Sequence, residues 1–372
     1  MLINRAFFRD YWQKKPLVLR NAVNLPETHP GKEALFSLAG DENIESRLVL
    51  EHGERPWEVH FGPFTSAELE ALPNSGWTIL FQDMDKHLPE VGSLLEQFRG
   101  MPRWRIDDIM ISYAVDKGSV GPHTDEYDVF LIQASGKRLW RIDTDPEADR
   151  SLVANLDMKI LQHFEAEQEL LLEPGDMLYL PPGIAHHGVA LDTGMTWSIG
   201  MRAPSAADLF QAFGEWLAEE RGEGPRYTDP PLTARNESAL LDAPAITRFC
   251  NLAAGELAFD GPFAEFLGHF LSRYRLAHEP APPEEALDES TLRTALRDGA
   301  VLRQNPWTRM LWIRINTQAA VFAAGKRYAC SEETAAALCD PQRLAHVSEG
   351  LRDRAIVCDL LNDGHLYLER EP

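Results

Sequence analysis

Residues 173–186 read EPGDMLYLPPGIAH: a Pro-Gly turn, a short apolar run, and a second turn of proline and glycine that leads to a histidine. An apolar run between two turns predicts a buried β-strand at 177–180. The pattern recurs through the surrounding region, with further candidate strands at 77–81, 105–115, 129–134, 139–142, 169–172 and 196–201. Many short strands with frequent turns favour a β-sandwich or jelly roll, and the lack of alternating helices argues against a parallel sheet.

Helical periodicity follows this mainly β region. Apolar residues recur at helical spacing over 206–221, 244–252 and 263–276, and the proline-rich stretch 279–285 reads as a linker. The last part mixes helices, one capped by Ser290 and one by Ser331, with strands at 310–315, 321–328 and 365–368. That mixture resembles a winged-helix module. We therefore expect three domains: a β domain at 1–205, a helical region at 206–283 and a winged-helix-like domain at 284–372.

The composition excludes several classes of protein. The 372 residues carry a formal net charge of −22, which disfavours binding to nucleic acid and favours a basic macromolecular partner. The helices of the last domain are not notably basic, so we expect no DNA binding. No apolar run reaches about 18 residues and no leader peptide is evident, so we expect no membrane span. The four cysteines form no CxxC pair, which favours reduced thiols in a cytoplasmic protein.

Two histidines and one carboxylate form a candidate metal site. His123 and Asp125 lie in the segment GPHTD, and on a strand residues two apart project to the same side. We expect His186 to come from the turn after the strand at 177–180, although the neighbouring His187 leaves a one-residue slip open. Such a set leaves open positions on the metal and suits Fe(II) oxygen chemistry. The competing interpretation is an ordinary hydrogen-bonded core histidine beside a surface pair.

Open iron positions call for O2 and for a co-substrate such as a 2-oxoacid, whose distal carboxylate needs a cation. Arg138 and Lys137 both lie on the strand after Ser135-Gly136. If the face with Trp140 is the interior, Arg138 points inward, and a guanidinium can bind a carboxylate through two hydrogen bonds. Lys137 remains a competitor, and Ser112 is a further candidate for contact with the co-substrate.

A second group of residues suits a long cationic side chain. Asp108, Met110 and Ser112 share one face of the predicted strand at 105–115. Tyr127 could pack along the methylene groups of such a side chain, and Ser198 could add a hydrogen bond. The alternative, that Asp108 is a solvated charge at the start of a strand, is at least as well supported by spacing alone.

Five stretches carry a resemblance to a known family: YWQKKPLVLR at 11–20, WRIDDIMIS at 104–112, GPHTDEYDVF at 121–130, EPGDMLYLPPG at 173–183 and SIGMRAP at 198–204. They resemble the JmjC-type 2-oxoglutarate oxygenases, and more closely the bacterial ribosomal oxygenases. The resemblance is specific over 1–205 and weaker beyond. It implies a double-stranded β-helix core (a cupin-like jelly roll), a helical dimerisation region that makes a homodimer, and the C-terminal module.

The resemblance also implies an activity. It implies Fe(II) at His123, Asp125 and His186, 2-oxoglutarate at Arg138, and hydroxylation at the β-carbon of an arginine in ribosomal protein sixteen of the large subunit. Asp108 would face the target guanidinium, with Met110, Tyr127 and Ser198 lining the pocket. Two alternatives stay open: a non-catalytic cupin-type binding or scaffold protein, and a JmjC hydroxylase that acts on a histidine or lysine of another protein.

Overall fold

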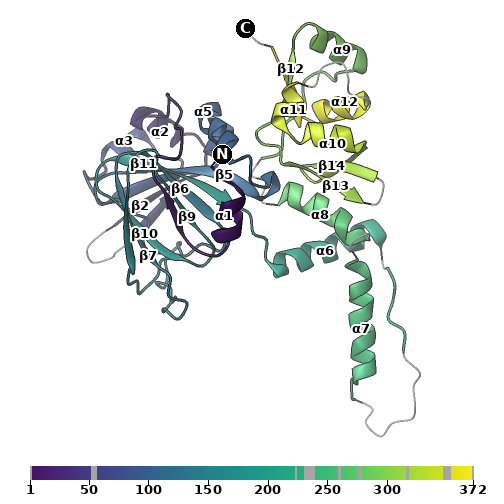
Figure 1. Ribbon diagram of the computed structural model, residues 1–372, viewed down its shortest axis with the longest axis horizontal. Coiled ribbons are helices and arrows are strands. Elements are labelled where there is room, and N and C mark those ends of the chain that lie inside the picture. Colours follow the sequence, from purple (N-terminus) through teal and green to yellow (C-terminus); the bar gives the residue numbers. More distant parts are fainter. Residues whose placement is uncertain are drawn as a thin grey trace. The chain divides into compact units, whose positions relative to one another are not determined.

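The chain forms two compact units, Met1–Ala203 and Pro204–Pro372, in a computed structural model (Figure 1). The structure describes residues 2–51, 57–222, 224–229, 239–258, 261–274, 276, 278–315, 318–346 and 353–370. In those ranges no helix has the length and apolar character that crossing a membrane requires. The expected division of the second unit between residues 283 and 284 stays a prediction.

The first unit is built on two antiparallel sheets. The eight-stranded sheet has the order β1 (Leu17–Leu19), β9 (Met177–Leu180), β6 (Val129–Ser135), β11 (Gly194–Met201), β5 (Ile106–Ala114), β4 (Trp77–Phe81), β2 (Ser46–Leu50) and β3 (Glu58–Phe61). The three-stranded sheet has the order β10 (Ala185–Ala190), β7 (Arg138–Asp143) and β8 (Gln168–Leu172). The strand-rich region expected from the sequence is therefore confirmed, whereas β2, β3 and β10 were not predicted.

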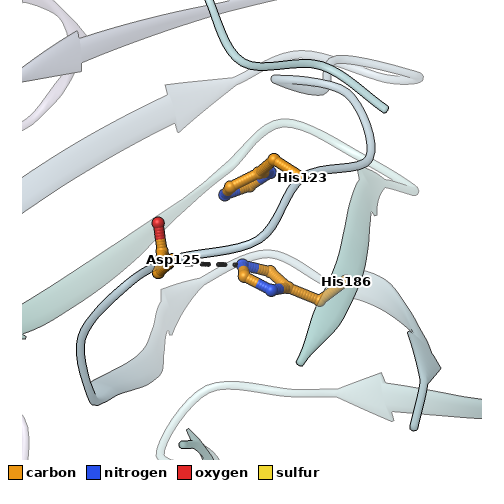
Figure 2. A group of neighbouring side chains, drawn as sticks. All are labelled: His123, Asp125 and His186. Carbon is orange, nitrogen blue, oxygen red and sulfur yellow. Dashed lines mark ion pairs between the residues drawn. The ribbon is translucent and has the colours of Figure 1, made fainter. Parts of the chain in front are cut away.

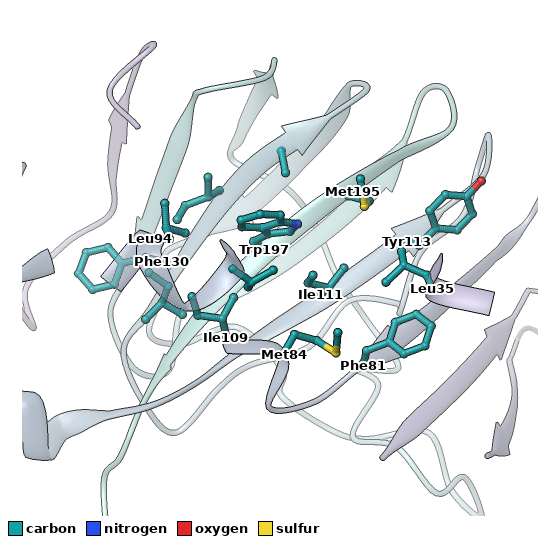
Figure 3. Packing of buried hydrophobic residues seen from close by; sticks show 14 of the residues in the cluster. Leu35, Phe81, Met84, Leu94, Ile109, Ile111, Tyr113, Phe130, Met195 and Trp197 are labelled. Atoms are coloured by element: carbon teal, nitrogen blue, oxygen red, sulfur yellow. The ribbon is translucent and has the colours of Figure 1, made fainter. Parts of the chain in front are cut away.

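Helices and a large apolar core cover one face of the eight-stranded sheet. Side chains alternate along β5, so that Ile109, Ile111 and Tyr113 enter this core. They are joined there by Trp197 of β11 and Phe130 of β6 (Figure 3). The short helical elements of this unit are α1 (Arg5–Asp10), α2 (Lys32–Leu38), α3 (Ser66–Glu70), α4 (Met84–His87), α5 (Pro89–Gly92), η1 (Ser93–Phe98) and η2 (Arg103–Arg105). They supply apolar side chains such as Leu35, Met84 and Leu94 to the same core.

The opposite face of the large sheet lies against the small sheet. A second apolar core contains Leu131 of β6 and Leu178 of β9 together with Trp140 and Ile142 of β7. The two sheets thus form the predicted β-sandwich. Beside this apolar layer part of the interior is polar, because Asp108 and Ser112 alternate along β5 with the residues of the large core. The interior between the sheets therefore has an apolar part and a polar part, and the polar part is the candidate for a functional site.

The second unit contains three longer helices followed by a small α+β part. The helices are α6 (Ala206–Arg221), α7 (Ala243–Glu256) and α8 (Pro262–Arg273), and then α9 (Glu289–Arg297), α10 (Glu332–Leu338), α11 (Pro341–Ala345) and α12 (Arg354–Asn362). Strand β12 (Val301–Gln304) pairs with β16 (Leu366–Glu369), and a three-stranded sheet contains β13 (Met310–Ile315), β14 (Gln318–Ala323) and β15 (Lys326–Cys330). Helix α8 packs on that sheet, where Gly268 adjoins the ring of Phe322.

This unit differs from expectation in several details: β12 was not predicted, and the helix expected over 263–276 ends at Arg273. The single strand predicted at 321–328 is divided between β14 and β15, because Ala324 and Gly325 form a turn with positive φ angles of 47° and 84°. Helix α9 begins two residues earlier than predicted, since Asp288 rather than Ser290 caps it by accepting the N–H of Thr291.

A buried carboxylate ties the N-terminal segment to the sandwich. Asp128 is fully buried and accepts hydrogen bonds from the hydroxyl of Tyr179 at 2.6 Å, from Gln13 at 3.1 Å and from Arg105 at 3.1 Å. The Tyr179 hydroxyl in turn accepts the backbone N–H of Gln13 at 2.8 Å. The network therefore connects residue 13 and the start of β5 to β6 and β9.

We expect Tyr179→Phe to lower the free energy of unfolding by about 1–3 kcal/mol, because a buried carboxylate loses its shortest hydrogen bond. Urea unfolding measures the change. The matched control is Tyr113→Phe, a buried tyrosine of the same core whose hydroxyl has no hydrogen bond to the described residues, and it should change stability by less. Equal losses in the two variants would contradict the importance of the Asp128 network.

Candidate metal centre

Three side chains converge at one edge of the interior. His123, Asp125 and His186 each offer a ligand atom, and these atoms all lie within 4.8 Å of one another (Figure 2). Asp125 Oδ2 lies 3.6 Å from His186 Nε2, and the two imidazole centroids are 4.2 Å apart. Among the residues that the structure describes, this is the group of histidines, cysteines and carboxylates whose spacing could hold a metal ion.

The segment that carries His123 and Asp125 is not the regular strand that the sequence led us to expect. It lies between β5 and β6, and His123 alone forms an isolated bridge, to His186. His123 N–H donates to His186 O at 3.0 Å and His186 N–H donates to His123 O at 2.9 Å. Gly183 N–H also donates to Asp125 O at 2.8 Å. Backbone hydrogen bonds to the start of β10, rather than strand periodicity, therefore place the three side chains together.

Each histidine ring is oriented by a backbone carbonyl. His123 Nδ1 lies 2.9 Å from Gly121 O, and His186 Nδ1 lies 2.9 Å from Ile184 O. A carbonyl only accepts, so Nδ1 carries the proton in both rings and Nε2 presents its lone pair. Burial, and then the adjacent His123, lower the pKa of His186 to about 4, which keeps the ring neutral at physiological pH. These are the tautomers that a divalent metal requires.

His187 lies outside this group. Its ring meets the rings of Phe164 and Trp57 edge-on, at centroid distances of 5.9 and 6.5 Å. Successive residues of β10 point to opposite faces, so His186 faces the interior and His187 packs against flanking segments.

The structure separates Arg138 from Lys137. Arg138 is only 3 % exposed, no carboxylate of the described residues pairs with it, and its Nε has no hydrogen-bond partner. Burial lowers the pKa of its guanidinium to about 10. Lys137 is 49 % exposed and pairs with Glu173 at 2.6 Å. A buried guanidinium without an anionic partner is costly, so Arg138 is a residue that could hold an anion that the described residues do not provide.

A carboxylate and an aromatic ring meet over Gly200 of β11. An ideal Cβ built on Gly200 would lie 3.5 Å from Asp108 Oδ1 and 3.9 Å from Tyr127 Cε2. The other oxygen of Asp108 accepts the N–H of Asp83 at 2.9 Å. Sequence reasoning had selected Asp108 and Tyr127 but missed Gly200 and Asp83. The one sequence feature that could have indicated Gly200 was its small size two residues after Ser198, since residues two apart on a strand share a face.

The remaining residues that the sequence predicted for the target pocket lie on β5 and β11. Met110 is paired with Ser198, and Ser112 with Thr196, in the register of β5 and β11. The Ser112 hydroxyl donates to Thr196 O at 3.3 Å. Met110 and Ser198 therefore continue the surface that begins at Asp108, whereas Ser112 lies deeper in the sheet.

Comparison with known proteins identifies the class. A model of the JmjC domain matches residues 93–209, and a model of the ROXA-like winged helix matches residues 257–367. The ribosomal protein uL16 3-hydroxylase of Escherichia coli is 34 % identical over 82 % of this chain and 81 % of its own. A probable ribosomal oxygenase of Haemophilus influenzae is also 34 % identical, over 82 % of this chain and 78 % of its own.

Solved structures agree with this. An X-ray structure of Escherichia coli YcfD has a TM-score of 0.82 and 32 % identity, covering 99 % of this chain and 98 % of that one. The ribosomal oxygenase YcfD in complex with cobalt and 2-oxoglutarate has a TM-score of 0.79 and 32 % identity, covering 98 % and 97 %. The fold is thus a JmjC jelly roll with a C-terminal winged helix, and the chain is a metal- and 2-oxoglutarate-dependent oxygenase.

More specifically, the chain belongs to the ribosomal oxygenase family.

Asp108 provides a pH-dependent test of this site. Burial, aided by Asp107 and Asp83, raises its pKa to about 7. The folded carboxyl therefore keeps its proton up to about pH 7, whereas the unfolded chain releases it near pH 4. The free energy of unfolding then falls as pH rises through this window and stays low above it.

We expect Asp108→Asn to raise the free energy of unfolding by about 2 kcal/mol at pH 8, because the amide removes a buried charge. Urea unfolding should show the gain shrinking toward pH 5. Asp107→Asn is the matched control and should destabilise the protein at pH 8, since Arg202, with 4 % of its side chain exposed, loses its ion pair at 2.9 Å. A loss of stability in Asp108→Asn at pH 8 would contradict the buried setting of this carboxylate.

Proposed function

We propose that this protein hydroxylates an arginine of the large-subunit ribosomal protein uL16, at the β-carbon of that side chain. One observation carries the proposal: His123, Asp125 and His186 converge, and the strand paired with that of His186 carries Arg138, a buried guanidinium that lacks an anionic partner among the described residues. The name of the Escherichia coli relative, uL16 3-hydroxylase, supports the choice of target. The net charge of −22 suits a basic ribosomal protein.

The donor set fits Fe(II), since two neutral imidazoles and one carboxylate leave positions open beside them. When bound, Fe(II) with 2-oxoglutarate and O2 supplies the oxidising chemistry. Arg138 binds the distal carboxylate of 2-oxoglutarate through its guanidinium, in a region from which water is excluded. Lys137, paired with Glu173 at the surface, is the weaker candidate for this role.

The target side chain is bound by a second set of residues. Asp108 pairs with the guanidinium through Oδ1, the oxygen nearest Gly200, and Tyr127, whose ring also lies near Gly200, packs against the methylene groups. Met110 and Ser198 continue the wall of this pocket. Holding the cation at one end fixes how far the carbon to be oxidised reaches toward the metal. Ser112 holds β5 against β11 through its hydrogen bond to Thr196 O and stays a candidate for contact with the co-substrate.

The alternatives are less well supported. A scaffold protein has no use for a buried unpaired arginine beside a three-residue metal site, because such an arginine destabilises the fold. Asp108 favours a cationic target, which disfavours a neutral histidine. A lysine would also pair with Asp108, and the experiment below distinguishes it from arginine.

The test uses the full chain with Fe(II), 2-oxoglutarate and purified ribosomal proteins under air. We expect a mass gain of one oxygen on uL16, and fragmentation should locate it on an arginine β-carbon. The variants His123→Ala and Arg138→Ala should lose at least about a hundredfold in turnover, while Lys137→Ala keeps most of it. A modified lysine or histidine in another protein would overturn the target, and turnover by His123→Ala would overturn the metal site.

We further propose that the protein is a cytoplasmic homodimer that does not bind DNA. No residue of α7 is buried, and Ile246 and Phe249 are each 47 % exposed on one side of this helix. Leu240, Leu241 and Phe210 of the same unit are also exposed. Apolar side chains grouped in this way favour a protein interface, here with a second copy of the chain.

We expect Ile246→Glu to convert a dimer of twice 41.9 kDa into a monomer, because a charge cannot be buried in an apolar interface without a partner. Light scattering after gel filtration measures the mass. Arg248→Glu changes an exposed residue on the opposite side of α7 and should leave the dimer intact. A wild-type protein of 41.9 kDa at micromolar concentration would exclude the homodimer.

A further inference from the structure

Trp140 of β7 occupies the interior between the metal site and Arg138. Its ring centroid lies 5.8 Å from that of His186 and 5.8 Å from the guanidinium carbon of Arg138. The side chain is 3 % exposed, and its indole Nε1–H is buried with no hydrogen-bond acceptor in the described parts of the chain. Burying an N–H without an acceptor costs free energy, so this position requires an explanation.

Gly188 provides the space for this ring. Gly188 is directly paired with Trp140 in the register of β10 and β7. A Cβ on Gly188 would lie only 2.7 Å from Cη2 and Cζ3 of Trp140 and 2.9 Å from Cε3. No L side chain fits there, although the backbone conformation of Gly188 would accept one. The six-membered ring therefore rests on β10, two residues after His186, and Nε1 lies on the part of the indole farther from that strand.

An indole N–H without an acceptor is not by itself evidence for a ligand, as two other tryptophans of this protein show. Trp197 and Trp216 also have an indole N–H without an acceptor among the described residues. Trp197 lies in the large apolar core, on the face of the eight-stranded sheet that points away from the small sheet. Trp140 also belongs to an apolar cluster, the smaller one between the two sheets, but it differs because Arg138, whose Nε is a second unsatisfied donor, contacts its ring and because a metal-site histidine adjoins it. The two donors belong to neighbouring side chains on one face of β7, so a single bound acceptor with two oxygen atoms would satisfy both.

We propose that Trp140 is a positioning residue for the co-substrate, donating its indole N–H to the carboxylate that Arg138 binds, and that Gly188 sets the place of the ring. This inference rests on the proposed function, which supplies a 2-oxoacid with a distal carboxylate. A guanidinium and a second donor from another side chain fix the orientation of a carboxylate, which a guanidinium alone leaves freer. Trp140 thereby selects dicarboxylate over monocarboxylate 2-oxoacids.

The direct test observes the indole proton. The full chain is loaded with Zn(II) and labelled with ¹⁵N at its tryptophan indoles, and 2-oxoglutarate is added. The Trp140 signal is identified by its absence in Trp140→Phe and by the strong shift that Co(II) causes. We expect 2-oxoglutarate to move this signal downfield, and 2-oxobutyrate, which has no distal carboxylate, to leave it in place.

Calorimetry on the same Zn(II) proteins gives the affinities. We expect Trp140→Phe to weaken 2-oxoglutarate binding about tenfold, the usual effect of losing a hydrogen bond to a charged group. Binding of 2-oxobutyrate should be unchanged. Gly188→Ala should weaken 2-oxoglutarate binding as well, because the new methyl group displaces the ring. Trp197→Phe is the matched control and should bind 2-oxoglutarate as the wild type does.

The outcomes separate this inference from the proposed function. If the wild-type protein binds 2-oxoglutarate while the Trp140 signal stays in place and Trp140→Phe keeps its affinity, the role of Trp140 is overturned and the oxygenase stands. If the wild-type protein does not bind 2-oxoglutarate at all, both are overturned. Because the shift is measured in the wild type, poor folding of a variant does not decide the result.

Discussion

The site depends on the reciprocal backbone hydrogen bonds between His123 and His186. They hold an irregular segment against the first residues of β10, at 3.0 and 2.9 Å, and so fix where two of the three ligand side chains begin. The carbonyls of Gly121 and Ile184 then fix how the two rings are turned. Because the main chain does both, the positions and orientations of the two imidazoles follow from backbone hydrogen bonds.

The sandwich carries this site at a cost in stability. Arg138 is buried without a partner among the described residues, and Asp108 is buried deeply enough for its pKa to reach about 7. Each of these groups destabilises the folded protein when no ligand is bound. The apolar layers on both faces of the eight-stranded sheet offset this cost. The polar part of the interior therefore contains buried ionisable groups that lower the stability of the fold, which is typical of functional sites.

The sequence predicted the strand-rich core because β4 and β9 are apolar runs between strong turn signals, and the structure bears out both with the predicted bounds. It missed β10, because a strand that contains His186, His187 and Gly188 has neither an apolar run nor alternation. It identified the three residues of the metal group from residue type and order. The need for glycine at positions 188 and 200 could not be predicted from the sequence. A side chain at either position would meet a residue of another part of the chain, and that contact is visible only in the folded protein.

Strand β5 has a consequence for how such a protein can change in evolution. Its odd-numbered residues Ile109, Ile111 and Tyr113 belong to the large core, and its even-numbered residues Asp108, Met110 and Ser112 face the site. Deleting or inserting one residue near the start of this strand would turn the core residues toward the site and the site residues toward the core. A single mutation of this kind would therefore abolish both folding and activity. Drift in target preference is thus confined to point substitutions here, while changes of length are tolerated only in the connecting loops.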